Sequence, residues 1–174
     1  MYLIFGGKGY VASNMIRYLS SNSKEYINIS TDSIYLSKSL INILDQLISA
    51  IGFEDELFYT KLIDQFVELF CIEFEGANFN TALIPTGLCH RFLTNKNQML
   101  KVNYYLPYLF TLISIKLKAK KIIFLSSAGV MSPLKQPITD QNLVYPLNNY
   151  TLTKYLCELR LENYFINRPD IESK

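Results

Sequence analysis

The pattern of apolar and polar positions divides the chain into two alternating kinds of segment. Short apolar runs occupy residues 2–5, 26–30, 81–85 and 121–125, and each is followed by glycine or polar residues. Runs of this length are typical of strands that are buried on both faces of a parallel sheet. The pattern therefore predicts four such strands.

Between these runs, apolar residues recur at the spacing of an amphipathic helix. The predicted helical segments are residues 11–19, 40–51, 62–70, 97–118 and 150–166. A further strand near residues 48–53 is an alternative to the end of the second helix, and the proline-containing residues 131–148 are expected to form a loop. Because strand and helix alternate, we expect a mostly parallel sheet with right-handed crossovers and helices on both faces.

Length and composition narrow the class of protein. A chain of 174 residues with 49% hydrophobic residues suits a single globular domain, here residues 1–174. The formal net charge is only +2, with the basic residues scattered, so no nucleic-acid partner is expected. The longest apolar stretch, residues 104–115, is too short to span a bilayer, so no membrane partner is expected either.

The cysteine and histidine content excludes two kinds of site. The three cysteines, Cys71, Cys89 and Cys157, form no closely spaced pair, which argues against a disulfide framework or a zinc site. We expect them to be small buried residues in a soluble, cytoplasmic protein. His90 is the one histidine, so no metal site is expected.

A glycine-rich turn follows the first predicted strand. Gly6, Gly9 and Ala12 stand three residues apart between that strand and the first helix. In a dinucleotide-binding turn, the first glycine allows a tight bend, the second lets backbone approach a pyrophosphate, and a small third residue packs helix on strand. An ordinary strand-to-helix turn is the alternative.

The end of the second predicted strand bears on the choice of cofactor. An acidic residue there holds the adenosine ribose diol in dinucleotide-binding folds. Asp32 could do so and favours NAD, although it could instead cap the next helix. If Ser30 occupies the position, a 2′-phosphate could be tolerated, with Lys8 as the nearest cation in the sequence, so NADP stays open.

Three residues form a candidate catalytic group. Tyr150 and Lys154 are four residues apart on a predicted helix and therefore share one face. An ammonium beside a phenol favours the phenolate, so Tyr150 could exchange a proton near neutrality. Ser127 follows the fourth predicted strand, where open α/β sheets place functional groups. In a chain with 13 tyrosines, the spacing of Tyr150 and Lys154 alone could also arise by chance.

Four motifs in order resemble the extended short-chain dehydrogenase/reductases, the NAD-dependent epimerase/dehydratase family that acts on nucleotide sugars. The segment FGGKGYVASNMIRYL resembles the family's TGGxGFIGxxLxxxL, and PLNNYTLTKYLCE resembles its PxxxYGxSKxxxE. The segments VNYY and IIFLSSAGV, in residues 102–130, resemble VNxxG and VxxSSxxVYG. The resemblance implies a Rossmann-like, doubly wound sheet that binds NAD(P).

The resemblance also implies roles for individual residues. Ser127, Tyr150 and Lys154 would be catalytic, with Tyr150 as the acid/base in hydride transfer between a nucleotide sugar and the cofactor. Asn103 would be mainly structural. The implied cofactor-binding residues are Gly6, Gly9, Tyr10, Val11, Ala12, Asp32 and Lys154.

The chain departs from the family pattern in places. Met131 and Ser132 replace the Tyr and Gly of VYG, and Asp55 is a candidate adenine contact without its usual motif. Family members continue well past the last helix, so the resemblance implies a chain truncated before the last strands and the C-terminal substrate lobe. A non-catalytic dinucleotide-binding module or an inactive remnant is the alternative function. The apolar segments 98–118 and 150–166 resemble the family's dimer-forming helices, which predicts a homodimer.

Overall fold

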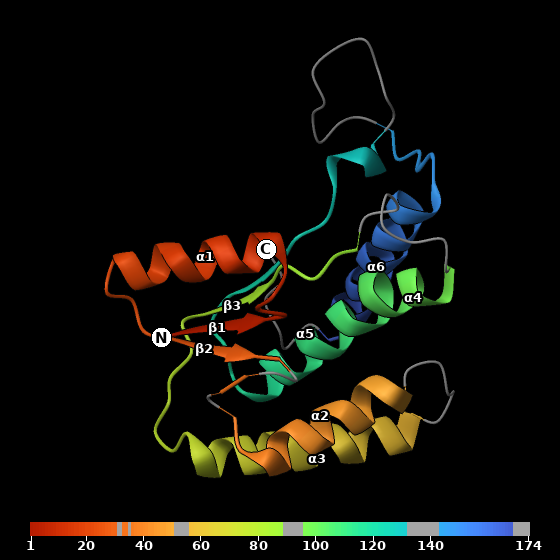
Figure 1. Cartoon of the computed structure of the whole chain (residues 1–174). Helices are drawn as coiled ribbons and strands as arrows, with labels where there is room; N and C mark the ends of the chain where they lie inside the picture. Colours follow the sequence, from red (N-terminus) through yellow and green to blue (C-terminus); the bar gives the residue numbers. More distant parts are fainter. Residues whose placement is uncertain (31–32, 35, 51–55, 89–95, 132–142, 169–174) are drawn as a thin grey trace. The chain divides into compact units, whose positions relative to one another are not determined.

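The structure is a computed structural model that describes residues 1–30, 33–34, 36–50, 56–88, 96–131 and 143–168. These residues divide into two compact units (Figure 1). The sheet unit comprises residues 1–86 and 109–124, and the helical unit comprises residues 87–108 and 125–174.

The sheet unit contains four parallel strands in the order β2-β1-β3-β4. Their bounds are Tyr2–Phe5 for β1, Tyr26–Ile29 for β2, Thr81–Ile84 for β3 and Ile122–Phe124 for β4. Leu3, Ile4 and Phe5 are fully buried, as expected for a central strand that is covered on both faces. All four strands lie where the apolar runs predict them.

Helices cover both faces of this sheet (Figure 1). Helix α1 (Tyr10–Ser21) lies on one face, while α2 (Lys38–Ala50), α3 (Glu56–Glu73) and most of α5 (Leu106–Lys116) lie on the other. The right-handed crossover rule explains this division, because the chain steps one way from β1 to β2 and the other way from β2 to β3 and β4. The predicted doubly wound parallel fold is confirmed.

The two faces of the sheet are packed by alternate residues of each strand. On the α1 side, Ile4 and Leu83 pack with Ala12 and Leu19. On the opposite side, the ring of Phe5 stacks on Phe110 of α5, with ring centroids 4.4 Å apart. Such alternation follows from the two-residue period of a strand.

Helices α2 and α3 pack on each other along the sheet unit. The strand considered near residues 48–53 is wrong for its first half, because Ile48 to Ala50 belong to α2, and residues 51–53 lie outside the described part of the chain. The segment is helical because its apolar residues recur at helical spacing, so that Leu40, Leu44 and Leu47 form one fully buried stripe. This burial outweighs the preference of its isoleucines for strands. Lys116 of α5 forms an ion pair with Asp64 of α3.

The helical unit is built around α6 (Asn149–Ile166), which packs on α4 (Lys96–Leu100), on the π-helical turn η2 (Lys101–Tyr105) and on the 3₁₀ turn η3 (Ala128–Val130). The single helix predicted over residues 97–118 is therefore wrong in detail. Its hydrogen bonds pass from α-helical to π-helical and back. Pro107 is the second residue of α5, just after this wide turn, and proline lacks the N–H that a regular helix would need there.

The predicted loop over residues 131–148 is described only at its ends, where Met131 and Val144 form an isolated antiparallel bridge.

The prediction that the cysteines are buried holds for one of the two that the structure describes. Cys157 is buried, as expected, but Cys71 is exposed because it lies on the solvent side of α3. Cys89 and His90 lie outside the described residues.

Candidate functional site

The glycine turn has the backbone geometry of a tight strand-to-helix connection. Gly6 adopts a φ of +76°, which favours glycine, and its N–H donates to the carbonyl of Ile29 at 3.0 Å. The N–H of Gly9 donates back to the carbonyl of Gly6 at 3.1 Å. Gly9 is also the N-cap of α1 and provides no side-chain cap, so N–H groups of the first turn lack partners within the helix.

The space around Gly9 distinguishes it from Gly6. A Cβ added at Gly6 would lie 3.1 Å from the Thr86 methyl, in a backbone conformation that side chains rarely adopt. A Cβ added at Gly9 would meet only the Gly6 carbonyl oxygen, at 3.6 Å, which is an ordinary contact. The fold therefore explains why residue 6 is glycine, whereas at residue 9 the space in front of the backbone is open and fits a bound phosphate.

The other residues at this turn contribute in different ways. Ala12 is 1% exposed and packs α1 on the sheet, as its small size predicts. The side chains of Tyr10 and Val11 are exposed, so any contact with a phosphate would come from their backbone. Strand β2 ends at Ile29, which leaves Ser30 as the first residue after it; Asp32 and Asp55 lie outside the described residues.

Asn28 supports the turn from β2. A Cβ added at Gly7 would lie 2.1 Å from Asn28 Nδ2 and 2.4 Å from its Oδ1, so the amide lies directly against the Gly7 backbone. The Asn28 Oδ1 atom is buried and has no hydrogen-bond partner within the described part of the chain. Packing against Asn28 therefore explains the glycine at position 7.

We expect Gly7→Ala and Asn28→Ala to be strongly non-additive. The methyl of Gly7→Ala must displace the Asn28 amide, and overpacking of this kind costs about 1–3 kcal/mol. In the double variant the methyl enters space that Asn28→Ala has vacated, so the double variant should be more stable than the sum of the single changes predicts. Thermal unfolding of the four proteins measures the coupling, and additive free energies would contradict the contact.

Ser127 stands in the helical unit, after β4. Its Oγ accepts a hydrogen bond from the Gly129 N–H at 3.2 Å and caps η3. A Cβ at Gly129 would lie 2.8 Å from the methyl of Thr151, which shows that the Ser127 turn packs closely on the first turn of α6. The same turn of α6 carries Tyr150.

The start of α6 is fixed by a capping box. The Asn148 side chain accepts from the Thr151 N–H at 3.0 Å, and the Thr151 hydroxyl accepts from the Asn148 N–H at 3.2 Å. These reciprocal bonds satisfy two donors that a helix start otherwise leaves open. They define where α6 begins, and hence which way Tyr150 and Lys154, about one turn apart, project from it.

Lys154 is 2% exposed, and its Nζ donates to the carbonyl oxygen of Leu125 at 2.8 Å. Burial lowers the pKa of Lys154 to about 8, because desolvation penalises the ammonium more than nearby Cys157 and Glu158 favour it. Burial also raises the pKa of the Cys157 thiol to about 12, which makes that thiol unreactive near neutrality. With a pKa of about 8, Lys154 can gain or lose a proton near neutral pH, which is more typical of lysines at functional sites than of lysines on the surface.

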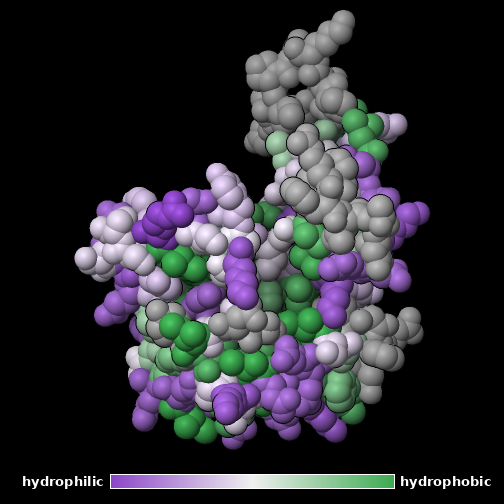
Figure 2. All heavy atoms as spheres, viewed as in Figure 1, coloured by the Kyte–Doolittle hydropathy of each residue, from purple (hydrophilic) through white to green (hydrophobic). Residues whose placement is uncertain are grey.

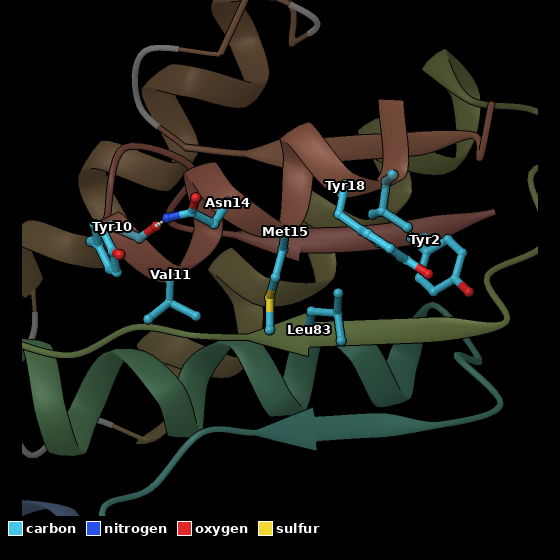
Figure 3. A pocket seen from close by; sticks show the side chains of 8 residues that line it. Tyr2, Tyr10, Val11, Asn14, Met15, Tyr18 and Leu83 are labelled. Atoms are coloured by element: carbon cyan, nitrogen blue, oxygen red, sulfur yellow. Dashed lines mark hydrogen bonds between the residues drawn. The ribbon is translucent and has the colours of Figure 1, made fainter. Parts of the chain in front are cut away.

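An apolar groove of about 510 Å³ runs along α1 in the sheet unit (Figure 3). It is lined by Tyr2, Tyr10, Val11, Asn14, Met15, Tyr18, Leu19 and Leu83. Its side chains come from α1, β1 and β3, and green apolar surface is also visible around this unit in Figure 2. None of Ser127, Tyr150 and Lys154 lines it.

Within the described part of the chain, no cluster of three or more histidine, cysteine, aspartate or glutamate side chains could hold a metal ion. No helix among these residues is both long and apolar enough to cross a membrane.

Comparison with known families decides the affiliation of the chain. The sequence model of the NAD-dependent epimerase/dehydratase family matches residues 2–166. The chain belongs to this family. The match includes the glycine turn, Ser127, Tyr150 and Lys154, and so confirms the resemblance seen in the motifs. No curated protein sequence matched the chain significantly.

Solved structures share the fold of this family member. The UDP-Glc/GlcNAc 4-epimerase of Campylobacter jejuni is 20% identical with a TM-score of 0.65, over 98% of this chain and 50% of its own. The UDP-glucose 4-epimerase of Thermotoga maritima, solved with UDP-glucose, is 18% identical with a TM-score of 0.63, over 95% and 51%. The UDP-glucuronic acid 4-epimerase of Bacillus cereus, solved with NAD, is 16% identical with a TM-score of 0.61, over 95% and 51%. The chain thus spans about half the length of each.

The structure adds site residues that the sequence did not single out. Asn28 is a polar residue within a short, otherwise mostly apolar strand, and this mismatch was the available signal. Gly87 follows the PT turn after β3, and a Cβ there would lie 3.2 Å from Lys154 Nζ. No local pattern could have joined Gly87 to a lysine 67 positions later.

Proposed function

We propose that the chain is the dinucleotide-binding part of an NAD(P)-dependent oxidoreductase of the epimerase/dehydratase type, acting on a nucleotide sugar. The observation that carries the proposal is the buried Lys154, on the helix that also presents Tyr150 and packs against the Ser127 turn. A cation is costly to bury, so its position one helical turn from a phenol favours a chemical role over an accidental spacing.

The proposed mechanism assigns one task to each side chain. NAD(P), when bound, accepts a hydride from a substrate carbon and can return it. The Tyr150 oxygen takes the proton of the hydroxyl on that carbon, so that the carbon–oxygen bond becomes a carbonyl. Lys154, on the same helix as Tyr150, would bind the nicotinamide ribose when the cofactor is bound, and the Ser127 hydroxyl would orient the reacting oxygen.

The sheet unit would hold the other end of the cofactor. The open space at Gly9 and the N–H groups at the start of α1 fit a pyrophosphate. The choice of NAD rests on Asp32, whereas Ser30 at the end of β2 would also admit NADP. The nucleotide-sugar class is supported by the family and by relatives solved with UDP-glucose. A cytoplasmic location is proposed because the three cysteines stand far apart in the sequence, which fits a reducing compartment.

A non-catalytic dinucleotide-binding module is the second candidate. It is favoured by the fact that the chain spans about half the length of the matched structures, together with the replacement of the VYG tyrosine and glycine by Met131 and Ser132. An inactive remnant of such an enzyme is the third candidate, and the experiment must distinguish it from the enzyme and from the binding module.

Calorimetry followed by chromatography of the nucleotide sugars separates these functions. We expect NAD to bind, and members of a UDP-hexose panel to be converted to new nucleotide sugars in the presence of NAD; the products are measured directly because a hydride that returns to the sugar leaves no net change in absorbance at 340 nm. Binding without turnover would support the module instead. Failure of a folded protein to bind either NAD or NADP would overturn both proposals and support the remnant.

We also propose that the chain forms a homodimer through segments 98–118 and 150–166. In the helical unit, the Arg160 guanidinium lies 3.8 Å from the Tyr108 ring centroid and within 6 Å of the Tyr104 and Tyr105 rings. Tyrosine and arginine dominate the binding energy of many interfaces. On the same helix, Leu152 and Leu156 are both exposed, one turn apart.

Sedimentation equilibrium at micromolar concentration should give twice the chain mass for the wild type and the single chain mass for Leu156→Asp. The aspartate would bury a charge in an apolar contact, which opposes association. Ile72→Asp, at an exposed apolar position of α3, is the matched control and should stay dimeric. A monomeric wild type would refute the dimer.

A further inference from the structure

Gly7, between Gly6 and Gly9 in the glycine turn, is held by two side chains from different elements of the sheet unit. The Ser13 hydroxyl of α1 donates to the Gly7 carbonyl oxygen at 3.2 Å. The Asn28 amide of β2 fills the place of a side chain at residue 7, because a Cβ there would lie 2.1 Å from Nδ2 and 2.4 Å from Oδ1. Gly7 is therefore fixed both by the helix that follows it and by the neighbouring strand.

The fold alone does not account for an asparagine at position 28. Its Oδ1 atom is buried without a hydrogen-bond partner among the described residues, which lowers the stability of a fold. β-branched residues are the usual choice at a strand position of this kind. A planar amide is thinner than a branched apolar side chain, and the close approach to Gly7 requires a thin group. Asn28 therefore contributes to the shape of the turn rather than to the stability of the strand.

The turn carries backbone donors at the start of α1. The Gly7 N–H donates to no acceptor in the part of the chain that the structure describes, and Gly9 caps α1 without a side chain. Successive backbone N–H groups in a turn bind an anion when they point to a common centre. The orientation of the Gly7 peptide therefore matters for the binding of a phosphate.

We infer that Ser13 and Asn28 are positioning residues for a phosphate-binding turn, because together they fix the Gly7 peptide before a phosphate binds. The inference rests on the proposed dinucleotide binding and deepens it. Both side chains act through Gly7 and need no contact with the ligand. A turn that is already ordered loses less conformational freedom on binding, which strengthens affinity.

Neither residue belongs to the dinucleotide-binding fingerprint. That fingerprint consists of the glycine or alanine positions of the turn and an acidic residue after the second strand. Ser13 follows the last small residue, Ala12, and its own N–H donates to the Gly9 carbonyl at 2.9 Å, which fixes its place on the helix. Asn28 lies within β2, before the position of the acidic residue. This chain therefore supports its turn with two polar side chains that the fingerprint does not require.

Titration with ADP and with adenosine, followed by NMR chemical shifts, tests the inference. ADP carries the two adjacent phosphates that the turn would bind, whereas adenosine carries none. We expect Asn28→Ala and Ser13→Ala each to weaken ADP binding by about 3- to 10-fold, because the turn must then be ordered during binding. The affinity for adenosine should stay at the wild-type value, which general damage to the fold would not allow.

Two matched variants separate positioning from other effects. Ser13→Thr keeps the hydroxyl that donates to Gly7 and should retain wild-type affinity for ADP. Ser20→Ala removes the hydrogen bond, 3.2 Å long, from Ser20 to the Tyr26 hydroxyl, which joins the same helix and strand at their other end. This control should also bind ADP with wild-type affinity.

Wild-type affinity for ADP in folded Ser13→Ala and in any folded Asn28→Ala protein would overturn the inference. An equal loss of affinity for ADP and for adenosine would overturn it as well, since that loss would come from the fold rather than from the phosphate site. A wild type that binds no ADP would refute the proposed dinucleotide binding together with this inference. A wild type that binds ADP while the variants lose no affinity would refute the inference alone.

Discussion

Gly9→Val should abolish NAD binding in a protein that still folds. The backbone at Gly9 has φ −67° and ψ 150°, an extended conformation that valine adopts readily. Its Cβ would meet only the Gly6 carbonyl oxygen, at 3.6 Å. The branched side chain would therefore occupy the open space at the start of α1, which we assign to the pyrophosphate.

The matched variant is Gly6→Ala, which should fail for a different reason. At a φ of +76° and with the Thr86 methyl 3.1 Å away, alanine is strained, which costs about 1–2 kcal/mol. For a chain of this size such a loss lowers the melting temperature by roughly 2–8 °C. Gly9→Val should lose affinity with little loss of stability, whereas Gly6→Ala should lose stability.

Calorimetric titration with NAD and thermal unfolding of both variants provide the comparison. If folded Gly9→Val binds NAD with wild-type affinity, the pyrophosphate does not lie at this turn. If Gly9→Val lowers the unfolding temperature as much as Gly6→Ala does, the space at Gly9 is not open to a side chain, and the assignment of that space to a phosphate fails.

The strands and most helices could be predicted because their signals are local. The run from Tyr2 to Phe5 is apolar on both faces and ends at glycine, and burial on both faces of a parallel sheet requires this pattern. The spacing of Tyr150 and Lys154 likewise places them about a turn apart on any helix. Their catalytic roles stay predictions, because a shared helix does not establish chemistry.

The features that escaped prediction depend on contacts between distant parts of the sequence or on changes of hydrogen-bond register. Apolar periodicity around Asn103 fits a continuous helix, since one widened turn barely alters the spacing. The contacts of Asn28 with Gly7 and of Gly87 with Lys154 join residues far apart in sequence. A glycine in the sequence does not show whether a ligand or a neighbouring side chain requires it, and only the space around its Cα separates Gly9 from Gly7 and Gly87.

Tyr150→Phe should reduce turnover of a nucleotide sugar by about 10²–10⁴-fold, the usual contribution of a positioned acid/base. The substitution removes one oxygen from a half-buried side chain and leaves the capping box of α6 intact. Folding and NAD affinity should therefore be unchanged, and the loss should fall on kcat. The measurement is the initial rate of product formation, followed by chromatography of the nucleotide sugar under saturating NAD.

Tyr155→Phe is the matched control, because Tyr155 is also half-buried on α6 but is not the tyrosine of the YxxxK pair. It should retain wild-type turnover. Wild-type turnover in Tyr150→Phe would remove the phenol from the mechanism, and an equal loss in both variants would assign the effect to packing. A loss confined to Tyr150→Phe is the outcome that the proposed chemistry requires, since the two substitutions remove the same atom and differ only in its place on the helix.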